Sequence, residues 1–182
     1  MVAQSGGPTA ALNASLAGVV ESALASAQVG DILGARFGLE GLLAENYVNL
    51  RRQPPGIWQA IKQTPSAALG SCRRKLRSGE ETQVLDSLRR LDVRYLVYIG
   101  GNDSADTSLA LDRAARAAGY DLRVVAVPKT IDNDLPLTDH CPGYGSAARY
   151  LAQSTQDAGL DTEAMRLSDP IKLIEVMGRD AG

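Results

Sequence analysis

A short polar cluster after residue 128 holds the densest set of groups in this sequence that could do chemistry. Lys129, Thr130, Asp132 and Asp134 place a cation, a hydroxyl and two carboxylates within six residues. The apolar run at 123–127 before them is typical of a short buried parallel strand. Ligands in open α/β sheets bind just beyond the carboxyl ends of such strands. The same residues also suit a turn, because Asn and Asp are common turn formers.

Three glycine-containing segments offer further places for an anion. Ser5-Gly6-Gly7-Pro8-Thr9 precedes a helical pattern, and Gly100-Gly101-Asn102-Asp103-Ser104 joins a strand pattern to another helical pattern. Glycines that lead into a helix N-terminus suit phosphate, since backbone N–H groups point outward and the helix dipole favours negative charge. Gly70-Ser71-Cys72-Arg73-Arg74-Lys75 is a basic loop, and its spacing is equally compatible with phosphate contact and with a solvated charge run.

The elements that must position these groups alternate between strands and helices. Hydrophobic periodicity predicts strands at about 1–4, 31–37, 94–99, 123–127 and 171–177, and helices at about 9–28, 57–63, 80–91, 102–118 and 143–158. This alternation predicts an α/β fold with a doubly wound, mostly parallel sheet, a Rossmann-like lobe whose first strand is only a tail. Because parallel strands end on the same side of a sheet, we expect Gly6, Gly100, Pro128 and Gly178 to lie along one edge.

Length and composition exclude several classes of protein. The 182 residues suffice for one domain with a sizeable core, so 1–182 is predicted to be a single lobe. A net charge of −2 with mixed signs predicts no nucleic-acid partner, and the absence of an apolar run of transmembrane length predicts no membrane partner. Cys72 and Cys141 lack metal-binding spacing and predict reduced thiols in a cytoplasmic protein.

Phosphoryl transfer is the chemistry that best fits these groups. It needs phosphate cradles, a metal-binding carboxylate and a base near the acceptor hydroxyl, and all three kinds of group follow predicted strands. A Rossmann-type dinucleotide site is disfavoured, since no G-x-G-x-x-G motif follows the first strand.

The motifs resemble those of the phosphofructokinases in order and approximate spacing. The resemblance rests on residues 100–104, 128–134, 145–149 and 175–179, with weaker likeness at 6–13 and 70–73. It runs through nearly the whole chain, and the combination of Thr130-Ile131-Asp132-Asn133-Asp134 with Glu175-Val176-Met177-Gly178-Arg179 is its most specific part. Members of that family phosphorylate the 1-hydroxyl of fructose 6-phosphate in glycolysis.

The resemblance implies a role for each matching residue. Asp132 would be the general base for the sugar hydroxyl, with Thr130 and Arg179 as the other catalytic residues. The donor phosphates would be bound by Gly7, Arg73, Gly101, Asp103, Ser104 and Lys129, and the sugar by Thr130, Asp132, Met177, Gly178 and Arg179.

The family also implies Mg²⁺ as the cofactor, with Asn102, Asp103 and Asp134 as candidate ligands. Relatives usually carry Asp where this sequence has Asn102. A neutral amide oxygen is a poorer ligand for Mg²⁺ than a carboxylate, so coordination would rest more on Asp103, Asp134 or the donor's own oxygens.

Two further departures concern the sugar site and the length. Some relatives carry an Arg that reaches a neighbouring subunit's sugar phosphate at the position of Pro170, so no residue takes that role here. Family members are also substantially longer. This chain therefore corresponds to an N-terminal fragment, and activity and homo-oligomer formation are expected of the complete enzyme. A truncated, non-catalytic phosphate-binding lobe is the alternative.

Pyrophosphate is the predicted phosphoryl donor, with ATP as the alternative. ATP-using relatives typically have Gly at the positions of Asp103 and Lys129. An Asp side chain would crowd and repel an α-phosphate, whereas Lys129 supplies a compact counter-charge for a small, highly charged donor. An ion pair between Asp103 and Lys129 that merely ties two loops together is the other reading of this pair.

Overall fold

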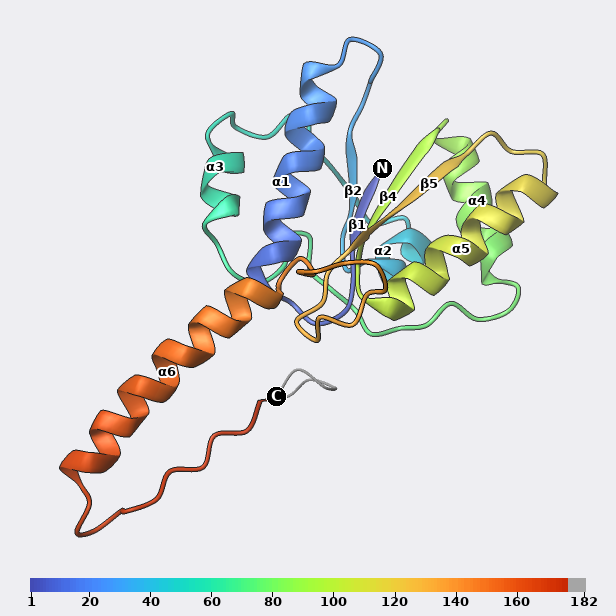
Figure 1. Cartoon of the computed structure of the whole chain (residues 1–182). Coiled ribbons are helices and arrows are strands. Elements are labelled where there is room, and N and C mark those ends of the chain that lie inside the picture. Colours follow the sequence, from blue (N-terminus) through green and yellow to red (C-terminus); the bar gives the residue numbers. More distant parts are fainter. Residues whose placement is uncertain (177–182) are drawn as a thin grey trace. The chain divides into compact units, whose positions relative to one another are not determined.

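The computed structural model describes residues 1–176, which fall into two compact units. The first, Met1–Lys129, contains a sheet with helices and is called the sheet unit below. The second begins at Thr130 and is called the helical unit, since its one regular element among the described residues is the helix α6 (Tyr144–Ala164) (Figure 1).

The sheet unit is built on strands in the order β3-β2-β1-β4-β5. Their bounds are Val2–Gln4 (β1), Leu33–Ala35 (β2), Tyr47–Asn49 (β3), Tyr95–Gly100 (β4) and Arg123–Pro128 (β5). All neighbouring strands are parallel except β2 and β3, which are antiparallel. Its helices are α1 (Ala10–Ala25), α2 (Leu39–Ala44), α3 (Ile57–Lys62), α4 (Glu80–Arg90) and α5 (Asn102–Ala117). The predicted α/β fold with a mostly parallel sheet is confirmed.

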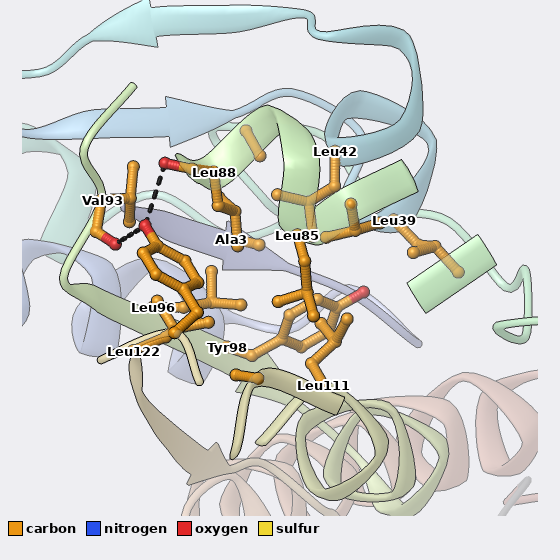
Figure 2. Close-up of a cluster of buried hydrophobic side chains, with 14 residues drawn as sticks. Ala3, Leu39, Leu42, Leu85, Leu88, Val93, Leu96, Tyr98, Leu111 and Leu122 are labelled. Carbon is orange, nitrogen blue, oxygen red and sulfur yellow. Dashed lines mark hydrogen bonds between the residues drawn. The ribbon is translucent and has the colours of Figure 1, made fainter. Parts of the chain in front are cut away.

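Helices cover both faces of this sheet, with α1 and α3 on one face and α2, α4 and α5 on the other (Figure 1). Successive strand residues point to opposite faces, which is why Val2 and Ile99 pack with α1 and α3. Ala3 and Tyr98 pack into the opposite cluster, with Leu85, Leu88 and Leu111 among its members (Figure 2). Two cores on one sheet therefore fix the position and direction of β1 and β4.

A buried tyrosine ties the end of α4 to this second core. The hydroxyl of Tyr120 lies within hydrogen-bonding distance of two carbonyl oxygens, that of Leu88 at 3.1 Å and that of Val93 (dashed lines in Figure 2). A buried hydroxyl that finds such partners avoids the cost of desolvation. These bonds hold the segment that leads from α4 into β4.

The carboxyl ends of β1, β4 and β5 lie side by side. Gln4 pairs with Ile99, and Gly100 pairs with Pro128. Glycine is required at position 100, because a β-carbon there would lie 2.2 Å from Ser104 Oγ and 2.7 Å from the carbonyl oxygen of Ser5. The expected alignment of Gly6, Gly100 and Pro128 is thus confirmed, whereas Gly178 lies outside the described residues.

The helical unit begins with a loop and continues into α6. Thr130 forms an isolated parallel bridge with Gly143, and its N–H donates to the carbonyl oxygen of Pro142 at 3.0 Å. Helix α6 is longer than the predicted 143–158. The strand predicted at 171–177 is wrong for its described part, because residues 171–176 have no regular secondary structure.

Two short elements were not predicted, α2 and the antiparallel strand β3. The other predicted helices and strands are present with shifted ends. No helix among the described residues combines the length and the apolar character needed to span a membrane.

Candidate functional site

Backbone hydrogen bonds fix the turn after β1 to two neighbouring segments. The N–H of Ser5 donates to Ile99 at 2.9 Å, and the N–H of Gly6 donates to Cys72 at 3.0 Å. Gly6 adopts φ +84°, a left-handed conformation that glycine reaches without strain. Ser5 Oγ also donates to the carbonyl oxygen of Cys72 at 3.0 Å. The turn is therefore fixed against both β4 and the basic loop.

Two cations converge on Gly7. A β-carbon built on Gly7 would lie 3.7 Å from Lys129 Nζ and 3.8 Å from Arg73 Nη2. These two cations come from segments far apart in sequence, because Lys129 follows β5 and Arg73 belongs to the basic loop at 70–75. Together with a glycine backbone that allows close approach, two cations at one point form a site for an anion such as phosphate. The structure thus brings together three of the predicted donor-binding residues.

The turn after β4 adds a second helix N-terminus to this place. A β-carbon on Gly6 would lie 3.7 Å from the backbone nitrogen of Gly101, so the two glycine turns touch. Gly101 is the N-cap of α5, and as a glycine it has no side chain that could cap the helix. Helix α1, which follows the first turn, is not capped by a side chain either. Backbone N–H groups in the first turn of a helix have no intrahelical partner and favour anions.

Ser104 differs from the other predicted donor-binding residues, because it is buried. Its side chain is 5% exposed and packs against Gly100, and its N–H donates to the carbonyl oxygen of Gly101 at 3.0 Å. Its predicted contact with the donor stays a prediction.

The basic loop alternates between two sides. Arg73 faces Gly7, whereas Arg74 points to α2 and α4, where it pairs with Glu40 at 3.0 Å and with Glu80. The hydrogen bond that Arg74 donates to Glu80 is the main reason that the pKa of Arg74 is raised. Lys75 again faces the turns, since its Nζ lies 3.1 Å from Asp103 Oδ1. This alternation orients Arg73 although the loop has no regular secondary structure.

A buried tyrosine lies behind the first turn. Burial raises the pKa of Tyr98 to about 12, and its neighbours include Ser5 and Cys72. A tyrosine hydroxyl is neutral at physiological pH even at its ordinary pKa of about 10, so Tyr98 adds no negative charge beside the first turn.

The acidic cluster belongs to the helical unit and is ordered by its own hydrogen bonds. Thr130 is 8% exposed, and its Oγ1 donates to Asp134 Oδ1 at 3.0 Å and accepts from the N–H of Asp132 at 3.0 Å. Asn133 adopts φ +52°, and its side-chain oxygen accepts from the N–H of Cys141 at 2.9 Å. The hydrogen bonds of Thr130 and Asn133 thus fix the backbone of the turn at 130–134. Asp132 lies in this turn and is half-buried.

The predicted magnesium ligands can be compared with the carboxylates of the described residues. Within the part of the chain that the structure describes, no three His, Cys, Asp or Glu side chains form a metal-binding group. Asp103 already pairs with Lys75, and Asp134 already accepts from Thr130. Mg²⁺ usually binds one or two carboxylates and keeps waters and substrate phosphates as its other ligands. Asn102 and Asp103 belong to the sheet unit and Asp134 to the helical unit, and their predicted binding of Mg²⁺ stays a prediction.

Three predicted site residues cannot be placed. Met177, Gly178 and Arg179 lie outside the described residues, so their roles in sugar binding and catalysis stay predictions.

Sequence reasoning missed the contacts of Arg74 and Lys75. The signal was present in Arg73-Arg74-Lys75, because alternate residues of an extended segment point to opposite sides.

Comparisons with known proteins identify the family of the chain. A model of the phosphofructokinase family matches residues 1–182. Over its whole length the chain is 47% identical to a pyrophosphate–fructose 6-phosphate 1-phosphotransferase of Xanthomonas campestris pv. campestris, of which it covers 44%. It is 42% identical to the enzyme of that name from Methylococcus capsulatus, with 99% of this chain and 44% of the relative covered. The chain thus spans less than half the length of these relatives.

A solved structure shows the same fold. The pyrophosphate-dependent phosphofructokinase of Nitrosospira multiformis superposes with a TM-score of 0.85 at 42% identity, over 92% of this chain and 42% of that chain. The family match, the shared fold and the two cations at Gly7 lead to one conclusion. The chain belongs to the phosphofructokinase family.

Proposed function

We propose that this chain supplies the phosphoryl-donor site of an enzyme that transfers a phosphoryl group from pyrophosphate to the 1-hydroxyl of fructose 6-phosphate. The observation that carries the proposal is the convergence of Arg73 and Lys129 on Gly7. Relatives that bear the name of this activity are 42–47% identical to the chain and support the same substrates.

Asp103 and Lys129 make pyrophosphate the proposed donor. Asp103 occupies the first turn of α5, beside the contact of the two glycine turns, where its side chain would crowd a nucleotide's α-phosphate. Lys129 places an ammonium group beside Gly7, where a small and highly charged donor needs a counter-charge. The site thus combines attraction for pyrophosphate with exclusion of ATP.

The acceptor step is assigned to the acidic cluster. Asp132 removes the proton from the 1-hydroxyl as that oxygen bonds to phosphorus, while the bond from phosphorus to the bridging oxygen breaks and phosphate leaves. Thr130 holds Asp132 through its backbone N–H. Arg179 is assigned to the transferring phosphoryl group, and Met177 and Gly178 to the sugar.

Mg²⁺ is proposed as the cofactor, and it would shield charge on the donor phosphates. Asn102 and Asp103 would contribute ligands from α5, and Asp134 would contribute one from the acidic cluster. The complete enzyme is proposed to be a homo-oligomer that acts in glycolysis in the cytoplasm. The two cysteines are free, which suits a reducing compartment.

The test is turnover by a full-length chimera in which this chain replaces the matching part of the Xanthomonas relative. Fructose 1,6-bisphosphate formation is measured with pyrophosphate and with ATP, in the parent and after Asp103→Gly with Lys129→Gly. We expect the parent to prefer pyrophosphate and the double variant to lose that preference. A parent that prefers ATP would contradict the donor assignment. A chimera that binds phosphate without turnover would favour a non-catalytic lobe.

A further inference from the structure

The position of Asp103 raises an electrostatic problem for the proposed donor. Its carboxylate lies in the first turn of α5, within one helical turn of the contact between Gly6 and Gly101. A carboxylate that repels the α-phosphate of ATP also repels pyrophosphate, which carries several negative charges in a small volume. The cations Arg73 and Lys129 act on the donor from the Gly7 side.

Lys75 lies where it offsets this repulsion. Its Nζ is 3.1 Å from Asp103 Oδ1, and it belongs to the same extended loop as Arg73, two residues along and on the same side. Arg74 between them is held away by Glu40 and Glu80. The loop therefore presents Arg73 to the place of the donor and Lys75 to the carboxylate of Asp103.

A purely structural role explains this pair poorly. The side chains of Lys75 and Asp103 are 75% and 65% exposed, and exposed ion pairs of this kind contribute little to stability. The loop is already fixed by the bond from Gly6 to Cys72 and by the pairing of Arg74.

We propose that Lys75 is a specificity-determining residue of the donor site, which neutralises Asp103 so that this side chain excludes the nucleotide by its bulk without repelling pyrophosphate. The inference rests on the proposed function and names a residue that works through another. Lys75 touches Asp103, and Asp103 shapes the space for the donor. Removal of Lys75 leaves one uncompensated negative charge near the donor, which should weaken pyrophosphate binding by about five- to tenfold at moderate salt.

The experiment is a double-variant cycle with inorganic pyrophosphate as the probe. Binding is measured by calorimetry for the 182-residue chain and for its Lys75→Ala, Asp103→Asn and Lys75→Ala/Asp103→Asn variants, at two ionic strengths. Lys75→Arg keeps the charge. Lys62→Ala is the matched control, because Lys62 also forms a partly exposed ion pair, with Glu21 at 2.7 Å, on α3 and α1. The KM values for pyrophosphate and fructose 6-phosphate are measured for the same variants in the full-length chimera.

We expect Lys75→Ala to weaken pyrophosphate binding and to raise only the KM for pyrophosphate, with a smaller effect at high salt. In calorimetry without Mg²⁺, where Asp103 has no metal to bind, Asp103→Asn in that background should restore binding to within about twofold of the parent, because the charge that Lys75 offsets is gone. Lys75→Arg and Lys62→Ala should bind like the parent.

Two results would overturn the inference while leaving the donor assignment intact. Unchanged binding in Lys75→Ala would show that the neutralisation is unimportant. A double variant as weak as Lys75→Ala would show that Lys75 contacts the donor directly rather than through Asp103. A parent chain and chimera that bind no pyrophosphate would overturn the donor assignment and this inference with it.

Discussion

Gly7 and Lys129 meet across the carboxyl edge of the sheet, since a β-carbon on Gly7 would lie 3.7 Å from the Nζ of Lys129. Position 7 follows β1, and position 129 follows β5, with β4 between these strands. The N–H of Lys129 donates to the carbonyl oxygen of Gly100 at 2.8 Å, which continues the ladder between β4 and β5. The sheet itself therefore places the ammonium group opposite the first glycine turn.

Gly7→Ala should weaken pyrophosphate binding by tenfold or more with little loss of stability. The added methyl would occupy the point on which Lys129 and Arg73 converge, yet no heavy atom outside its chain neighbours lies closer to it than 3.7 Å. Gly18→Ala in α1 is the control, because a β-carbon there has no atom within 4 Å, and Ala stabilises a helix interior by about 1 kcal/mol relative to Gly. Calorimetry with pyrophosphate and thermal melts measure both effects. Unchanged binding in Gly7→Ala would remove Gly7 from the donor site.

Asp132→Asn in the full-length chimera should lower kcat by roughly 10²–10⁴-fold, the usual range for a general base. Pyrophosphate binding should stay near the parent value, because Gly7, Arg73 and Lys129 are intact. Asp157→Asn on α6 is the control, as Asp157 is an exposed carboxylate that accepts from Gln153. The measurement is the coupled assay for fructose 1,6-bisphosphate. Near-parental kcat in Asp132→Asn would end the assignment of Asp132 as the base.

Local patterns predicted most of this fold, because its main elements depend on residues close in sequence. The apolar periodicity of α1 and the run before Gly100 both mark elements whose buried faces are visible in the sequence itself. The strand β3 was missed because an antiparallel edge strand of three residues depends on its pairing with β2, which no local pattern contains. The segment at 171–176 shows the converse. Its apolar residues favour a strand, yet Ile171 and Leu173 are 83% and 94% exposed.

The candidate site divides in the same way. Glycine turns and the end of the apolar run at 123–127 predicted which segments of the sheet unit gather at the carboxyl edge, and the sheet order explains why they do. The pairing of Asp103 with Lys75 could not be deduced, because either Lys75 or Lys129 is a suitable cation for that carboxylate. Lys75 reaches Asp103 because of the course of the basic loop at 70–75, which Cys72 and Arg74 fix.

Glu80→Gln should lower the melting temperature at neutral pH, and the difference from the parent should vanish in acid. The N–H of Arg77, and next the guanidinium of Arg74, hold the pKa of Glu80 below its ordinary value of 4.5. A carboxylate with a depressed folded-state pKa stabilises the fold above 4.5, and this contribution is lost as pH falls through the folded-state pKa. Glu81→Gln, at the neighbouring position of α4, is the control. Thermal melts from neutral pH to below the folded-state pKa of Glu80 measure the effect. An equal loss of stability in Glu80→Gln at every pH would contradict it.

The isolated chain should self-associate through β5, and Val125→Lys should suppress this association. Among the described strands β5 stands at the edge of the sheet, next to β4, and Val125 is 48% exposed. An apolar edge strand offers unpaired backbone groups to another chain, and a lysine there disfavours such pairing. Leu109→Lys is the matched control, because Leu109 is 49% exposed on the helix α5, whose backbone groups are not available for strand pairing. Sedimentation velocity should show oligomers for the parent and for Leu109→Lys, but mainly monomers for Val125→Lys. A monodisperse parent monomer that unfolds cooperatively would contradict the prediction, and equal association of the two lysine variants would place the contact elsewhere than β5.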